Sequence, residues 1–184
     1  SASGEPGPKY WQNHADYKIN TSLNTETHSV TGNVEIAYTN NSPDNLKFLW
    51  LQLDQNIYKK DSRGSNTTTQ TGGRWANGGF TDGSVIKSIS IKKKKKTYTP
   101  KFNVSDTRMQ IWLNDALIGT GGKVKISVQF EFIVPEYGTD RMGRLKTKNG
   151  IVYEVAQWFP RMAVYDDLQG WNTLPYIGAG EFYL

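Results

Sequence analysis

The amino-acid sequence predicts an all-β fold, a mostly antiparallel β-sandwich or saddle-like sheet with little helix. The chain is rich in Thr, Val, Ile, Tyr and Trp, which favour strands, and it holds 18 glycines for turns. Apolar and polar residues alternate in several stretches, and runs of the Ala, Leu and Glu that favour helices are few. With 184 residues, the chain is long enough for one domain with a buried core.

The first strands are expected shortly after the N-terminus. Residues 1–9 have the Ser, Gly and Pro content of a flexible linker or a cloning scar, so residues 10–184 are expected to form a single β domain that begins at the aromatic pair Tyr10 and Trp11. Period-two alternation over 17–23 and 34–38, around a turn-rich segment, predicts a hairpin.

The middle of the chain predicts further strands around one long loop. Residues 46–53 are almost continuously apolar, which indicates a strand covered on both faces. Residues 61–83 are dense in Gly, Ser, Thr and Asn and predict a long loop, part of which packs down through its aromatic residues. Strands are expected to resume at 85–91 and again at 109–113.

The last third contains the clearest strand. Over residues 124–134, apolar residues alternate with Lys, Ser, Gln and Glu, which predicts a half-buried strand. A polar loop is predicted over 136–149, another strand over 151–158 and a short helical turn over 163–169. Residues 181–184 read as the start of a strand, so we expect the domain to be truncated within a larger architecture.

The basic character of the chain is local. The net charge is +5, and residues 92–96 are five consecutive lysines, without which the chain would be almost neutral. Such a run can bind phosphate or anionic lipid, but a solvated edge strand or loop is the more common structure and is what we expect. Only Tyr98 supplies a nearby aromatic ring, so no nucleic-acid partner is expected. Nucleic-acid binding through the lysines stays a third possibility, one that predicts retention on heparin.

Several classes of site are excluded by residue content. The chain has no Cys, which rules out disulfides, a thiolate nucleophile and a thiolate zinc site. No apolar run approaches the roughly 20 residues that span a bilayer, so no membrane span is expected.

Catalytic and metal motifs are not found either. His14 and His28 fit no metal-ligand spacing, and no nucleophile elbow is present. Asp166 and Asp167 are adjacent, so they are expected to form a turn rather than an acid–base pair. The sequence therefore predicts no catalytic residue and no metal site in this chain.

Two groups of residues resemble a known family. The first comprises KYWQNHADYKIN (9–20), VTGNVEIAYTNNSPD (30–44) and LWLQLDQN (49–56). The second comprises YEVAQWFPRMAVYDDLQGW (153–171) and GEFYL (180–184). Together they bracket nearly the whole chain and resemble the N-terminal domain of aminopeptidase-N-type zinc metallopeptidases of the gluzincin clan, in a variety associated with Bacteroidetes-like bacteria. The QWFPR stretch is the most specific part.

The resemblance implies a non-catalytic domain that packs on a thermolysin-like catalytic domain and walls one side of its peptide-binding cleft. The H-E-x-x-H and G-x-M-E-N motifs of that family would lie further along the parent chain, and neither occurs here. The zinc ion is therefore implied for the missing catalytic domain, and no cofactor for this fragment. No activity is expected of the fragment alone, and a periplasmic or extracellular parent is implied.

The resemblance also implies one contribution to substrate binding. Family members place a Gln or Glu from the equivalent late segment against the free α-amino group of the substrate. Gln157 is the expected residue and Glu154 is its rival. An amide or carboxylate oxygen there accepts hydrogen bonds from the ammonium group and so helps to recognise the peptide N-terminus. The alternative for Gln157 is a polar residue on a buried strand, satisfied by backbone groups.

A second class of function competes with the first. The chain is alternatively a free-standing β-sandwich module that binds carbohydrate or a protein partner. Exposed aromatic side chains at Trp75, Trp171 and Tyr176 would then form the binding surface.

Overall fold

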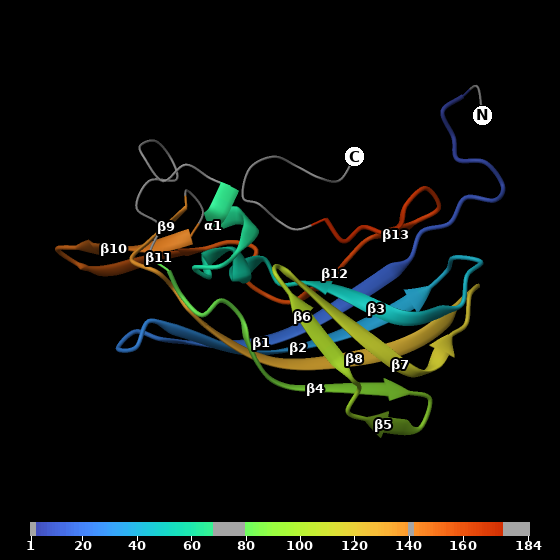
Figure 1. The fold of residues 1–184 in the computed structure, drawn as a ribbon, viewed down its shortest axis with the longest axis horizontal. Coiled ribbons are helices and arrows are strands. Elements are labelled where there is room, and N and C mark those ends of the chain that lie inside the picture. Colours follow the sequence, from blue (N-terminus) through green and yellow to red (C-terminus); the bar gives the residue numbers. More distant parts are fainter. Residues whose placement is uncertain (1–2, 68–79, 140–141, 175–184) are drawn as a thin grey trace.

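The computed structural model describes residues 3–67, 80–139 and 142–174. Within these ranges most residues lie in β-strands, and every strand pairing is antiparallel (Figure 1). The helices described are η1 (Asp54–Tyr58) and α1 (Arg63–Thr67), each of five residues. The prediction of an all-β, mostly antiparallel fold with little helix is confirmed.

The larger layer is a five-stranded sheet in the order β1-β2-β8-β4-β5. Its strands are β1 (His14–Asn24), β2 (Ser29–Asn40), β4 (Val85–Lys93), β5 (Lys96–Tyr98) and β8 (Gly122–Ile133). On β8, Val124, Ile126 and Val128 are buried, whereas Lys123 and Lys125 on the opposite face are exposed. The predicted strand over 124–134 and the predicted first hairpin, formed by β1 and β2, are therefore confirmed.

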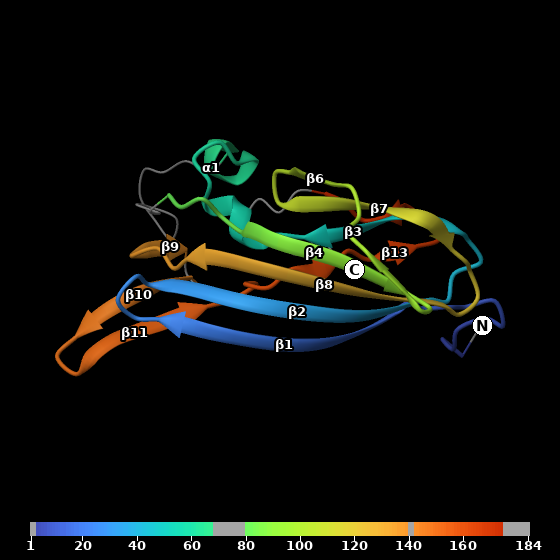
Figure 2. The same cartoon turned by 90° about the horizontal axis from the view of Figure 1, so that it is seen from below.

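A four-stranded sheet in the order β12-β3-β7-β6 covers the apolar face of the larger sheet (Figure 2). Its strands are β3 (Leu46–Gln52), β6 (Phe102–Ser105), β7 (Arg108–Leu117) and β12 (Arg161–Met162). Ile36 and Ile126 from one layer and Leu49 and Ile111 from the other are fully buried in one apolar cluster. Each such side chain contributes roughly 1.5–3 kcal/mol by burial, so this cluster holds the two layers together as a sandwich.

The strand predicted over 46–53 is observed as β3, which ends at Gln52. Leu49 and Leu51 face the sandwich core. Phe48 and Trp50 are half-buried on the other face, where the Arg108 guanidinium lies 5.6 Å from the centre of the Trp50 ring. Both faces of β3 are thus covered, although not equally.

The prediction of a polar loop over 136–149 is wrong. This part of the chain forms β9 (Tyr137–Thr139) and β10 (Met142–Thr147), and β10 pairs with β11 (Gly150–Val155) in a hairpin. Leu145 on this hairpin is 65% exposed. Because the hairpin buries little apolar surface, its sequence lacks the alternation that marks β8. The strand predicted over 151–158 also ends early, at Val155.

The helical turn predicted over 163–169 is wrong as well. Tyr165–Asp166 forms β13, and it pairs with β14 (Gly170–Trp171) in a small hairpin. The carboxylate of Asp166 accepts hydrogen bonds from the backbone N–H groups of Leu168 and Gln169, at 2.9 and 2.7 Å. Gly170 has a positive φ of 70°, which closes the turn. The expectation that the Asp166–Asp167 pair forms a turn is confirmed.

Two further predictions concern segments that are only partly described. The long loop predicted over 61–83 instead contains α1, and residues 68–79, including Trp75, lie outside the described residues. The strand start expected at 181–184 also lies outside them.

The lysine block forms the turn between β4 and β5 and the strand ends beside it. Because β5 lies at the edge of its sheet, this is the solvated edge strand and loop expected for such a run.

Candidate functional site

Gln157 lies in the irregular segment that connects β11 to β12. Its side chain is exposed, while Trp158 and Phe159 beside it are half-buried and pack on the core. Gln157 has a φ of 46°, in the left-handed region that non-glycine residues rarely adopt. The alternative expectation, a buried strand residue, is therefore wrong. A conformation of this kind persists where the surrounding structure fixes it.

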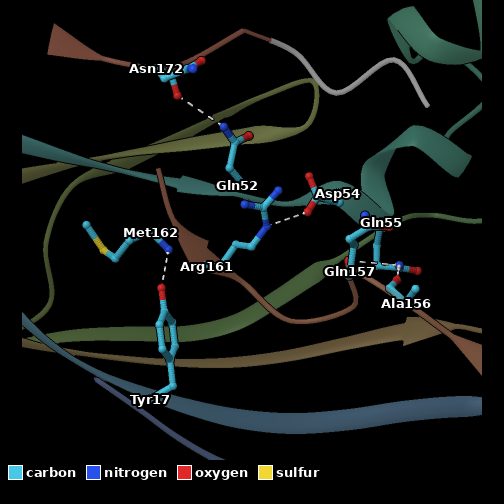
Figure 3. A network of polar contacts seen from close by, with 9 residues as sticks. All are labelled: Tyr17, Gln52, Asp54, Gln55, Ala156, Gln157, Arg161, Met162 and Asn172. Carbon is cyan, nitrogen blue, oxygen red and sulfur yellow. Dashed lines mark hydrogen bonds and ion pairs between the residues drawn. The ribbon is translucent and has the colours of Figure 1, made fainter. Parts of the chain in front are cut away.

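A buried amide fixes the backbone at Gln157. Nε2 of Gln55, in η1, donates hydrogen bonds to the carbonyl oxygens of Ala156 and Gln157, both at 3.3 Å (Figure 3). The Gln55 residue is only 3% exposed. The backbone carbonyl of Gln157 is thus bound from the protein interior. The Gln157 side chain is exposed and forms no hydrogen bond with the other described residues.

An ion pair fixes the same segment on its C-terminal side. Nε of Arg161 donates to Oδ2 of Asp54 at 2.9 Å, and Asp54 precedes Gln55 in the chain. The Asp54 side chain is 2% exposed and that of Arg161 is 30% exposed. Two consecutive residues of η1 therefore hold the segment at two points, on either side of Trp158 and Phe159.

Burial and Arg161 shift the pKa of Asp54 in opposite directions. Loss of water raises the pKa of its carboxyl group above the usual value, and the Arg161 guanidinium only partly reverses that rise. The ion pair thus compensates a charge that the interior disfavours, so Asp54 depends on Arg161.

The strand next to this segment is tied to both layers of the sandwich. The N–H of Met162, on β12, donates to the Tyr17 hydroxyl of β1 at 3.0 Å, and the N–H of Ala163 donates to the carbonyl of Trp50 on β3 at 2.9 Å. Gln52 of β3 also donates, through Nε2, to the carbonyl of Asn172 at 3.3 Å. The segment that carries Gln157 therefore ends in a firmly bonded strand (Figure 3).

Glu154 lies in a different setting from Gln157. It is on β11, directly opposite Gly143 of β10, and it is exposed. Its neighbours Tyr153 and Val155 pack against the core, so Glu154 points to the opposite face of the hairpin. The structure places the two candidates in adjacent segments, and no hydrogen bond joins them in the part of the chain described here.

The two histidines have separate partners. Nε2 of His14 lies 3.0 Å from Oδ1 of Asp16, and Nδ1 of His28 lies 2.5 Å from the Tyr153 hydroxyl. Among residues 3–67, 80–139 and 142–174, no three His, Cys, Asp or Glu side chains gather in a way that could hold a metal ion.

A groove of about 580 Å³ lies apart from Gln157, between residues 9–13, hereafter the N-terminal arm, and the β12–β13 region. Trp11 packs on Tyr165 with ring centres 6.0 Å apart, and Nδ2 of Asn13 donates to the buried Tyr38 hydroxyl at 2.8 Å. Neither Gln157 nor Glu154 lines this groove. The arm is thus attached at Trp11, as the aromatic pair predicts, while Tyr10 is 59% exposed.

The aromatic surface expected for a binding module is only partly described. Trp171 is half-buried, and its ring packs against Tyr165 and Tyr38 with centres 5.1 and 6.3 Å apart. Trp171 is therefore part of the packing, and the expectation of an exposed ring there is wrong. Trp75 and Tyr176 lie outside the described residues.

Sequence reasoning missed the residues that position Gln157. Asp54 and Gln55 follow directly on the apolar run that forms β3, and they stay buried. Polar residues that continue a buried run have to find polar partners, and this was the available signal. Arg161 is in the QWFPR stretch, which the resemblance had already singled out.

Comparison with known proteins gives no family. No protein-family model matches the chain, and a search of curated proteins finds no match either. In the described parts of the chain, none of the helices has the length and apolar character needed to cross a bilayer.

Proposed function

We propose that this chain is the non-catalytic N-terminal domain of a zinc aminopeptidase, where it packs on the catalytic domain, walls the peptide-binding cleft and uses Gln157 to recognise the free N-terminus of the substrate. The proposal starts from the resemblance of the two groups of residues described above. Glu154 remains the rival for the same role.

One observation carries the proposal furthest. Gln157 combines an exposed side chain with a left-handed backbone whose carbonyl is bound by a buried glutamine. Binding sites depend on groups whose position is set before the ligand arrives, because ordering them on binding would reduce affinity. Glu154, on a hairpin strand that buries little surface, has fewer such constraints.

The chemistry of an amide suits an ammonium ligand. The side-chain carbonyl oxygen of glutamine accepts hydrogen bonds from the three N–H donors of an α-ammonium group. Hydrogen bonds to a charged group contribute about 1.5–3 kcal/mol each, which is enough to discriminate a free N-terminus from a blocked one.

The zinc ion of such an enzyme would belong to the catalytic domain. The residues described here do not fit a zinc site, because His14 and His28 each have another partner and lie on different segments. This chain would contribute binding and positioning, and no step of hydrolysis.

Replacing Gln157 tests the proposal. In the full-length enzyme, we expect Gln157→Ala to lower kcat/KM for aminoacyl substrates by about 10- to 100-fold, because a hydrogen bond to the ammonium group is lost. Zinc content should stay unchanged. Glu154→Ala is the matched control and should alter kcat/KM by less than a factor of about 3. Unaltered kinetics in Gln157→Ala, or a larger loss in Glu154→Ala, would contradict the assignment of Gln157.

A free-standing binding module is the second candidate, and the groove beside the N-terminal arm favours it. A cleft of this size with aromatic and polar walls could hold a carbohydrate or a short peptide segment. The coding sequence discriminates between the two: an H-E-x-x-H motif downstream of Leu184 supports the aminopeptidase, and a stop codon there supports the module.

A further inference from the structure

The fold adds two lysines to the block that the sequence contains. Lys92 on β4 lies directly opposite Lys125 on β8, and Lys123 precedes Lys125 by two residues on the same face. Lys94 and Lys95 form the adjoining turn, with Lys94 at a φ of 55°. All five side chains, hereafter the basic patch, are exposed at the end of the five-stranded sheet where β8 begins, and those on the strands lie on its outer face.

This arrangement works against the stability of the sheet. Directly opposed residues on antiparallel strands have Cβ atoms only about 5 Å apart, and like charges there repel. Lys92 and Lys125 occupy such a pair of positions. A solvated edge strand explains lysines at the turn, but it does not explain a lysine on the central strand β8 facing another on β4.

Three carboxylates lie near the patch without forming an ion pair with its lysines, and one of them is the exposed Asp115 of β7, beside the β4–β5 turn. Asp16 and Glu35 are the acidic residues on the closest part of this face, and they lie on β1 and β2. Asp16 is bonded to His14 at 3.0 Å, and Glu35 lies directly opposite Lys18. Among the described residues, no ion pair involves any lysine of the patch.

The turn that presents the patch is held in place. Nζ of Lys93 donates to the carbonyl oxygens of Asp115 and Ala116 on β7, at 3.1 and 2.6 Å. The same end of the sandwich carries Ile118, in the loop that leads into β8, and this side chain is 63% exposed. The anchored turn and its exposed lysines thus lie at the same end as an exposed aliphatic side chain.

We propose that this end of the domain docks on the surface of an anionic lipid bilayer, through the basic patch and Ile118. Lysines act as point charges toward a diffuse layer of headgroups, and each contributes roughly fivefold in affinity near such a surface. An exposed aliphatic side chain gains free energy by inserting at the headgroup boundary of a bilayer. It would gain nothing from contact with a polyanion in water. A nucleic acid is disfavoured, because the patch has no arginine fork and no stacking aromatic ring.

Membrane docking leaves the candidate substrate residue accessible. Trp158, next to Gln157, packs on Phe130 with ring centres 6.2 Å apart, on the inner face of the five-stranded sheet. The basic patch is on the outer face, and Lys125 is separated from Phe130 by roughly 17 Å along β8. The two surfaces can therefore be occupied at the same time.

Vesicle co-sedimentation tests the proposal. The protein is mixed with vesicles of phosphatidylcholine alone or of phosphatidylcholine with phosphatidylserine, at low ionic strength and at about 0.15 M salt. We expect binding only to the vesicles that contain phosphatidylserine, and weaker binding at the higher salt. The triple variant Lys92→Gln, Lys123→Gln, Lys125→Gln should bind roughly 100-fold more weakly. Ile118→Ser should weaken binding severalfold without changing its salt dependence.

The control variant carries Lys60→Gln, Lys146→Gln and Lys148→Gln, which removes the same charge from exposed positions outside the patch. It should bind like the wild type, and circular dichroism should be the same for all variants. The proposal is overturned if vesicles with phosphatidylserine are not bound at low salt, or if both triple variants lose binding equally. Binding to single-stranded DNA or heparin that depends on the patch, without binding to vesicles, would also overturn it.

Discussion

Arg161→Met will lower the free energy of unfolding by about 3 kcal/mol at neutral pH. The substitution keeps the aliphatic part of the side chain and removes the guanidinium that bonds Asp54 at 2.9 Å. A buried carboxylate without its partner costs about 3–5 kcal/mol, and we take the lower end because the Arg161 side chain is 30% exposed. Urea denaturation of the variant and the wild type measures the difference.

The loss should depend on pH in a defined direction. Burial already raises the pKa of Asp54, and removal of Arg161 raises it further. A group with a raised folded pKa stabilises the fold below its unfolded pKa, about 3.9 for Asp, and this stabilisation is lost as the pH rises through the folded pKa. The difference between variant and wild type should therefore be largest at neutral pH and shrink toward pH 4.

A double variant isolates the charge. Asp54→Asn combined with Arg161→Met removes the buried carboxylate together with its partner, so it should recover part of the stability lost by Arg161→Met alone. The stability loss of this double variant should have no pH dependence from position 54, because Asp54 has been replaced by Asn. A deficit of Arg161→Met that stays constant between pH 4 and neutral pH would show that packing, and not the buried charge, is responsible.

Phe130→Ala will lower the free energy of unfolding by about 3–5 kcal/mol, the usual range for a buried aromatic side chain. Phe130 is 1% exposed, and its ring stacks on Phe132 with centres 6.4 Å apart. A Cβ atom at Gly32 would lie 2.6 Å from Cζ of Phe130, so the ring fills the space that a side chain at position 32 would occupy. Its removal leaves a cavity and withdraws support from Trp158.

Phe102→Ala is the matched control for this prediction. Phe102 lies on the edge strand β6 and is 41% exposed, so its truncation should change stability by less than about 1 kcal/mol. Thermal unfolding of both variants measures the two effects. Equal losses in the two variants would contradict the description of Phe130 as a core residue.

The sequence predicts most clearly the strands that bury at least one face, although the alternation in β1 also predicts a strand that is mostly exposed. β2 and β8 alternate cleanly because one face of each lies on the core, and β3 reads as apolar because both of its faces are covered. β6 and β10 are missed because their residues are exposed or half-buried for most of their length. Pairing with a neighbouring strand defines these two, and single-sequence periodicity carries no signal of pairing.

The candidate site could likewise be predicted only in part. Gln157 follows from the resemblance, while its left-handed backbone and the hydrogen bonds from Gln55 depend on residues about one hundred positions apart in the chain. The predicted turn at 163–169 fails for a related reason, because Asp166 forms a local turn whose flanking residues pair as strands. A contact between distant segments decides the first outcome and the pairing of two short strands decides the second, and the local sequence pattern reveals neither.

The most direct test of the central proposal compares substrates with and without the α-amino group. In the full-length form of the proposed aminopeptidase, kcat/KM is measured for an aminoacyl substrate and for its des-amino analogue, with the wild type and with Gln157→Ala. If Gln157 binds the ammonium group, the variant loses activity on the aminoacyl substrate and keeps its low activity on the analogue, so the ratio between the two substrates falls. An equal loss on both substrates, or no loss on either, would contradict the proposal.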